Sequence, residues 1–314
     1  MQTIVDMDIE EAKSEFQHLF GRVELADRKQ FLRWIEENFN EDDGPSNEDI
    51  IIQSIAESLR SELPINGLVN NEQIKHDGID QNSGSNDQCT IHVDKFLYDD
   101  DTVDDLCNRG QLSQNYCLDC KSHNTAPLSF ISHSCSIVQL KFIFQHVLPD
   151  IKYKTVIDIG SRLGAVLYGT YYYSDAANII GIEFNEEFCR LQQKMVDVYQ
   201  LHDRIKIICA DVCTQKMLLQ QADVVVLNNV FEFFASVEDQ TKIWRFLAES
   251  IQRKGCYLVT VPSLEQSLQC LQTGINVKSW VKSIPLDYNA AASAIGIEEN
   301  DLDEIQQIFL YQVL

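Results

Sequence analysis

Short apolar runs alternate with helical patterns through the second half of the chain. The runs predict seven strands, at Thr155 to Ile159, Asn178 to Phe184, Arg204 to Ala210, Asp223 to Asn229, Cys256 to Pro262, Trp280 to Leu286 and Ile308 to Leu314. Such alternation is typical of a parallel sheet wrapped by crossover helices. We therefore predict an α/β fold, a doubly wound and mostly parallel seven-stranded sheet, preceded by an N-terminal helical region.

Three of the connecting segments carry clear helix signals. An apolar stripe at Phe188, Leu191, Met195 and Val198 follows Asn185, which predicts a helix with Asn185 as its N-cap. The run from residue 241 to 255 predicts a helix closed by its final glycine, and the run from 137 to 148 predicts a helix stopped by the following proline.

The N-terminal half has three kinds of sequence. Residues 1–65 are helical in pattern, with Ile51, Ile55 and Leu59 on one face after a break at Gly44 and Pro45. Residues 66–92 are polar and rich in Gly and Asn, so we expect a flexible linker. Residues 93–136 form an acidic, cysteine-bearing segment, and residues 137–314 carry the predicted sheet.

Composition narrows the cellular setting. No run reaches the ~20 apolar residues of a membrane helix, and the first residues lack the basic start and apolar stretch of a signal peptide. The ten cysteines are scattered through apparent core segments, which favours reduced thiols over a disulfide framework. We therefore expect a cytoplasmic or nuclear protein with no membrane partner.

The formal charge is −23, and most of it lies in the first 150 residues, which hold 28 acidic and 11 basic side chains. A field of this sign repels phosphate backbones, so nucleic acid is a less favoured partner and a basic protein a more favoured one. The alternative is that the charge only keeps the protein soluble.

Candidate chemistry begins where the first predicted strand ends, at Asp158, Gly160 and Gly164. In an open α/β sheet, ligands lie beyond the carboxyl ends of the strands, and glycines there allow close approach of the backbone. The spacing acid-x-Gly-x-x-x-Gly differs from the Gly-x-Gly-x-x-Gly of dinucleotide sites. S-adenosylmethionine has no phosphate and carries a sulfonium and an ammonium, which suits a carboxylate at Asp158.

Two more acids end the next two strands. Glu183, nineteen positions after Gly164, is placed to accept hydrogen bonds from ribose hydroxyls. Asp211 ends the third strand, where an adenine amino group needs an acceptor, with Val212 beside the ring. Three acids at successive strand ends predict one shared pocket.

These residues resemble the class I S-adenosylmethionine-dependent methyltransferases over roughly residues 137–314. The resemblance implies S-adenosylmethionine as the cofactor, a final antiparallel strand pair, and a flap over the methionine end at Ser132, His133 and Ser134. Where that family often has a middle glycine, this chain has Arg162. We expect either a tighter loop or an arginine side chain swung outward.

The fourth predicted strand ends in the sequence LNNVFEFF. Asn228 and Asn229 offer amide carbonyls to an attacking amine, and Phe231, Phe233 and Phe234 can line an alkylammonium channel by cation–π contact. The segment resembles that of the non-SET histone-lysine methyltransferases. The alternative is that the asparagines cap a turn and the phenylalanines are core. Glu232 is either a base or orienting group, or a solvated loop carboxylate.

A second candidate site lies among the cysteines of the N-terminal half. Cys117 and Cys120 form one Cys-x-x-Cys, with Cys107 before it and His123, His133 and Cys135 after it. A structural zinc needs four such ligands, but no second Cys-x-x-Cys completes the pair. Zinc, a redox dithiol and unliganded cysteines all remain open.

Taken together, the pattern predicts an S-adenosylmethionine-dependent methyltransferase that N-methylates a basic protein side chain such as lysine. Asn228, Asn229 and Phe231 are the candidate catalytic residues, and Asn228 is also a candidate cofactor contact. The alternatives are an RNA or small-molecule methyltransferase, or a catalytically silent scaffold with the same fold.

Overall fold

The computed structural model describes residues 19–20, 22–23, 28, 46–65, 67, 69, 90–112, 115–117, 125–127, 129–229, 231–232, 234–294 and 302–314. The chain divides into two compact units, residues 1–50 and 51–314, and the second unit holds the sheet. Most of the predicted helical region before residue 46 and most of the linker predicted at 66–92 lie outside the described residues.

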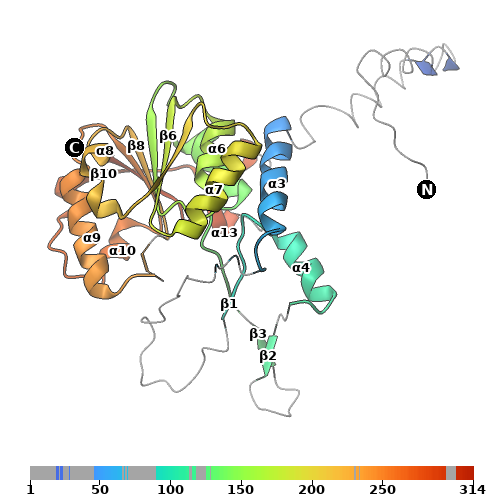
Figure 1. Cartoon of the computed structure of the whole chain (residues 1–314), viewed down its shortest axis with the longest axis horizontal. Helices are drawn as coiled ribbons and strands as arrows, with labels where there is room; N and C mark the ends of the chain where they lie inside the picture. The colour runs from blue at the N-terminus through green and yellow to red at the C-terminus, as the bar shows by residue number, and fades with distance from the viewer. Residues whose placement is uncertain are drawn as a thin grey trace. The chain divides into compact units, whose positions relative to one another are not determined.

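A seven-stranded sheet forms the centre of the second unit (Figure 1). Its strand order is β10-β11-β9-β8-β5-β6-β7. Neighbours from β9 to β7 pair in parallel, whereas β11 pairs antiparallel with both β9 and β10. The strands are β5 (Thr155–Ile159), β6 (Asn178–Glu183), β7 (Ile205–Cys209), β8 (Val224–Asn228), β9 (Tyr257–Val261), β10 (Val281–Ile284) and β11 (Phe309–Val313).

Each predicted strand is therefore present, within two residues of its predicted ends, and the α/β prediction is confirmed. The antiparallel pairing of the last two strands is also as expected. Because β11 lies between β9 and β10, the last strand of the chain is internal and β10 forms the edge.

Alternate side chains of the central strands pack into two separate hydrophobic cores, one on each face of the sheet. Val156 and Val224 pack on one face with helices α5 (Ile137–Lys141), α6 (Ala165–Tyr173) and α7 (Glu186–Val198). Ile157 and Val225 pack on the other with α9 (Val237–Ser250) and α10 (Leu264–Leu268). Figure 1 shows α6 and α7 on the side of the sheet away from α9. Burial on both faces explains why the strands are apolar throughout instead of alternating.

Shorter elements connect these layers. They are the π-helix η1 (Phe142–Val147), the 3₁₀ helix η2 (Val212–Thr214), α8 (Lys216–Leu219), α11 (Val277–Trp280), α12 (Tyr288–Ala294) and α13 (Leu302–Ile305). The predicted helix at 137–148 is thus α5 continued by η1. The predicted N-cap is also present, because the Asn185 side chain accepts a hydrogen bond from the Glu187 N–H.

The predicted end of the α9 helix is wrong. The helix stops at Ser250, because Ile251 leaves the helical conformation and turns fully into the core. The freed carbonyl of Ile251 accepts a hydrogen bond of 2.9 Å from the Trp280 indole. Gly255, with φ of 85°, makes the turn into β9 instead. The helix therefore ends where the Ile251 side chain enters the core, and not at Gly255, which the sequence pattern predicted as its end.

The segment before residue 137 shares the core of the sheet domain. Helix α3 (Asn47–Arg60) buries Ile52, Ile55 and Leu59 in the same cluster as Val156. Phe96 and Leu97, which follow strand β1 (Thr90–His92), join them, and helix α4 (Asp100–Asn108) adds partly buried contacts. Three further short strands are β2 (Asn115–Cys117), β3 (Thr125–Pro127) and β4 (Ser129–Ile131), of which β4 pairs in parallel with β1. None of the helices in the described ranges is long and apolar enough to cross a membrane.

If α3 belongs to this core, truncating its buried face will destabilise the whole domain. We expect Ile55→Ala to lower the free energy of unfolding by about 3 kcal/mol, which corresponds to a fall in Tm of ~6 to 12 °C. Ile50→Ala, at a position on the same helix that is 49% exposed, is the matched control. Thermal unfolding followed by circular dichroism gives both values, and equal small shifts would show that α3 does not pack on the sheet.

Candidate functional site

A cavity of about 310 Å³ lies at the carboxyl edge of the parallel strands. Its walls come from the segments that follow β5, β6, β7 and β8, together with the loop before α5. Of the predicted cofactor residues, the structure brings Gly160, Glu183, Asp211, Val212 and Asn228 to this cavity, along with the predicted catalytic residues Asn229 and Phe231. Its volume is at the lower end of the range for small-molecule sites.

The loop between β5 and α6 turns sharply under the cavity. Gly160 and Gly164 have φ of 70° and 85°, in the left-handed region that favours glycine. Gly160 lines the cavity, whereas Gly164 caps α6 and lies against Tyr168. A Cβ at Gly164 would come within 2.8 Å of the Tyr168 ring, so this glycine serves packing.

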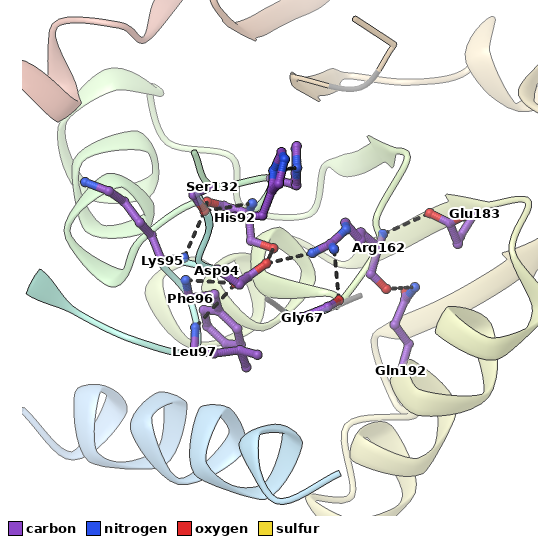
Figure 2. Close-up of polar contacts among 12 residues, drawn as sticks. Gly67, His92, Asp94, Lys95, Phe96, Leu97, Ser132, Arg162, Glu183 and Gln192 are labelled. Atoms are coloured by element: carbon purple, nitrogen blue, oxygen red, sulfur yellow. Dashed lines mark hydrogen bonds and ion pairs between the residues drawn. The ribbon is translucent and has the colours of Figure 1, made fainter. Parts of the chain in front are cut away.

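Glu183 is the most firmly held acid of the site. One carboxylate oxygen accepts a hydrogen bond of 3.0 Å from the Arg162 backbone N–H, and the other accepts one of 2.8 Å from the Asn185 N–H. Burial raises the pKa of Glu183, and these backbone N–H groups partly offset that rise. The carboxylate is therefore oriented before any ligand binds (Figure 2).

Asp158 is buried and does not line the cavity. Burial, and then the nearby charge of Glu183, raise the pKa of Asp158 to about 8. At neutral pH its carboxyl group therefore holds a proton for much of the time, and a cation bound nearby would favour the ionised form.

Asp211 and Val212 occupy the far end of the cavity. The Asp211 side chain is exposed, and its carboxylate accepts a hydrogen bond of 2.8 Å from the Cys213 N–H, which caps η2. Val212 is buried beside it and presents an apolar wall. A polar rim next to an apolar wall suits a flat heteroaromatic ring with an exocyclic amino group.

Arg162 is buried and not swung outward, which rules out one of the two alternatives expected from the sequence. Its backbone has a φ of 43°, and its guanidinium forms a buried salt bridge of 2.7 Å with Asp94. The same guanidinium donates to the Gly67 carbonyl and lies over the Phe188 ring. A partner from outside the sheet holds the side chain inward (Figure 2), and no local sequence pattern indicates this pairing across 68 positions.

The asparagines after β8 differ in their surroundings. Asn228 ends the strand and lines the first cavity. Asn229 has a φ of 47°, and its N–H donates to the Val261 carbonyl at 2.8 Å. A non-glycine residue held in this conformation at a cavity wall is often part of a functional site.

A second cavity, of about 220 Å³, opens beside the first, between α9, α10 and the end of β9. Asn229 and Phe231 line both cavities. Phe231 packs edge-on against Trp244, with ring centroids 5.7 Å apart. Glu232, Gln240 and Gln266 add polar groups to the second cavity. Phe231 therefore belongs to the hydrophobic core and also lines the cavities. Phe233 lies outside the described residues.

His133 also lines the first cavity. Its Nε2 lies 3.0 Å from Nδ1 of His92, and its ring meets Phe234 edge-on at 4.9 Å. Burial, followed by the charges of Arg162 and His92, lowers the pKa of His133 to about 3. The ring is therefore neutral at physiological pH and adds no positive charge to the cavity.

The predicted zinc site stays a prediction. The side chains of Cys117, Cys120 and His123 lie outside what the structure describes. Cys107 is half-buried and free, Cys135 is fully buried in the core, and His133 lines the cavity instead. In the described part of the chain, no group of three or more His, Cys, Asp or Glu side chains could hold a metal.

The strand order, with an antiparallel strand inserted next to the edge of a parallel sheet, is that of the class I methyltransferases. Residues 157–259, from β5 through β9, match the family model described as a methyltransferase domain. This part of the chain is therefore similar to methyltransferase domains. No curated protein matches the chain.

Solved structures with a similar arrangement are methyltransferases of several kinds. An RNA methyltransferase from Salinibacter ruber, in complex with S-adenosyl-L-homocysteine, is 13% identical with a TM-score of 0.35, over 56% of this chain and 88% of that one. An O-methyltransferase from Thermotoga maritima is 16% identical with a TM-score of 0.37, over 49% and 56%. A methyltransferase from Geobacter sulfurreducens is 10% identical with a TM-score of 0.34, over 57% and 76%.

The raised pKa of Asp158 predicts that this residue lowers the stability of the folded protein as the pH rises. The pKa is about 8 in the fold and 3.8 for an unperturbed Asp, so the folded state binds more protons and stability falls as pH rises between these values. Asp158→Asn removes this loss. We expect its Tm to exceed that of the wild type by about 3 °C or more at pH 8, and by less at pH 5.

Melting curves from pH 5 to 9 test this directly. The difference in Tm should widen with pH and level off above about pH 8. Glu249→Gln, at an exposed position, should follow the wild type at every pH. A difference for Asp158→Asn that does not change with pH would mean that Asp158 titrates as in the unfolded chain.

Proposed function

We propose that this protein uses S-adenosylmethionine to methylate the nitrogen of a basic protein side chain such as lysine. The observation that supports this most is the pair of adjoining cavities that share Asn229 and Phe231. One cavity has the acids expected for the cofactor, and the other is smaller and is lined in part by Glu232, Gln240 and Gln266. A methyl group would pass between them at the shared wall.

The donor groups of the first cavity fit this cofactor. Glu183 has two oxygens oriented for the ribose hydroxyls, and Asp211 with Val212 suits the adenine. Gly160 and Asn228 would contact the methionine portion, with Asp158 beneath them. When bound, S-adenosylmethionine supplies an electrophilic methyl group on a positive sulfur. A neutral His133 and several carboxylates make surroundings that such a cation tolerates.

The second cavity fits a long, cationic side chain. At about 220 Å³ it is the smaller of the two cavities described here. Phe231 offers an aromatic face to an alkylammonium, and Glu232 provides a carboxylate at the wall. The acidic N-terminal half would attract a basic protein.

Catalysis at this site would depend on alignment more than on proton transfer. The amide carbonyl of Asn229, at the shared wall, can accept a hydrogen bond from the attacking amine and direct its lone pair toward the first cavity. His133, with a pKa of about 3, is too weak a base to take the amine's proton at neutral pH. Glu232 is the carboxylate of the second cavity that could receive the proton or pass it to water.

Two measurements test this function in order. Calorimetry should detect binding of S-adenosylmethionine to the wild type and lose it in Glu183→Ala; no heat with the wild type would favour a silent scaffold. Tritiated-methyl transfer to lysate, followed by nuclease or protease, should then give label that only protease removes. Label removed by nuclease would point to RNA, and label in the small-molecule fraction to a metabolite.

Asn229→Gly separates alignment from cofactor binding. Glycine accepts the left-handed backbone of this position, so the change removes the amide with little strain. We expect kcat to fall by at least about tenfold while the dissociation constant of S-adenosylmethionine changes less than about twofold. Asn228→Ala, which alters the first cavity alone, should instead weaken cofactor binding. Equal effects of both variants on binding would argue against a division of roles.

A further inference from the structure

The proposed cofactor cavity is lined in part by a positively charged residue, although the proposed ligand is itself positively charged. Arg162 lines the cavity, and burial in a medium of low dielectric makes its charge act over several ångströms. The field of Arg162 does reach the cavity wall, because it contributes to the lowered pKa of His133. An uncompensated arginine here would repel a sulfonium.

Asp94 is the counter-charge to this arginine. It follows strand β1, outside the family match that begins at residue 157, and its side chain is 1% exposed. One carboxylate oxygen accepts hydrogen bonds from the Arg162 guanidinium at 2.7 Å and from the Ser134 hydroxyl at 2.6 Å. The other oxygen accepts from the Phe96 N–H at 3.0 Å. The carboxylate is thus fixed by its own segment as well as by the arginine.

Arg162 connects its salt bridge with Asp94 to Glu183, the acid proposed to bind the ribose. The Arg162 N–H holds Glu183, while the Arg162 carbonyl accepts a hydrogen bond of 2.7 Å from Gln192. The guanidinium end of Arg162 is held by Asp94 and by the Gly67 carbonyl. Figure 2 shows these contacts running in a line from Asp94 through Arg162 to Glu183.

We propose that Asp94 is a positioning and charge-balancing residue of the cofactor site. It cancels the positive charge that Arg162 brings to the cavity, so that the cavity accepts the positively charged cofactor and not only its neutral product. It also fixes the loop whose N–H orients Glu183. This inference rests on the proposed use of S-adenosylmethionine, and it makes the segment after β1 part of the catalytic domain.

The electrostatic role can be separated from a purely structural one by comparing two ligands. S-adenosylmethionine carries the sulfonium charge, whereas S-adenosylhomocysteine has a neutral sulfur and is otherwise nearly identical. Loosening of the loop would weaken both to a similar extent. An unbalanced Arg162 charge would weaken the first selectively.

The experiment measures both dissociation constants by calorimetry for the full-length protein and its variants. For Asp94→Asn we expect the affinity for S-adenosylmethionine to fall at least about tenfold more than that for S-adenosylhomocysteine, because one unit charge at an effective dielectric constant near 20 has an effect of this size even from about 12 Å away. Asp94→Asn combined with Arg162→Gln removes both charges and should return the ratio to within about twofold of the wild type.

Two further variants complete the test. Ser134→Ala removes an uncharged donor from the same Asp94 oxygen without changing the net charge of the site, so it should affect both ligands alike and leave the ratio unchanged. Arg162→Gln alone leaves Asp94 unbalanced and should shift the ratio the opposite way, toward S-adenosylmethionine; it tests the charge argument even if Asp94→Asn does not fold. Failure of the wild type to bind either ligand would overturn the proposed function. Normal wild-type binding with an unchanged ratio in Asp94→Asn and in Arg162→Gln would overturn this inference alone.

Discussion

Buried carboxylates at one edge of the sheet are the constraint on which this structure depends. The parallel strands β5 and β6 end side by side and bring Asp158 and Glu183 together in a site that is nearly closed to water. Burial of charge is unfavourable unless hydrogen bonds or opposite charges compensate it. Glu183 is compensated by two backbone N–H groups, whereas Asp158 is left with a pKa of about 8. Protonation of Asp158 lowers the cost of its burial, and a cation bound nearby would favour its ionised form.

The loop between β5 and α6 is constrained by contacts on both of its sides. Below it, Ser161 lies so close to β6 that a Cβ on Gly181 would come within 2.7 Å of the Ser161 hydroxyl. Above it, the Arg162 peptide is held through its N–H by Glu183 and through its carbonyl by Gln192. The left-handed backbone of Arg162 is unusual for a long side chain and persists because these contacts over-determine it. The buried salt bridge to Asp94 adds a further anchor.

Much of the fold could be predicted from the sequence, because doubly buried parallel strands give continuous apolar runs that are easily recognised. Glu183 and Asp211 lie at the ends of such runs and line one cavity as predicted, whereas Asp158, which was predicted to share that cavity, is buried and does not line it. Asp94 was not recognisable, because its partner is 68 positions away and no local pattern relates an acid after β1 to an arginine after β5. The end of α9 was missed for a similar reason: the Trp280 indole that donates to the Ile251 carbonyl belongs to a distant helix.

The distribution of charge around the cavity also limits the chemistry of its own side chains, namely the His133 ring and the asparagine amides. His133 is kept neutral by burial and by the nearby arginine, so it presents an uncharged ring next to Phe234. The asparagine amides are neutral by nature. Under the proposed function, such a site would hold a sulfonium next to side chains that are weak nucleophiles. The nucleophile would then come from a separate acceptor, which avoids self-modification. The protein would contribute binding, charge balance and direction, while reactivity would belong to the two substrates.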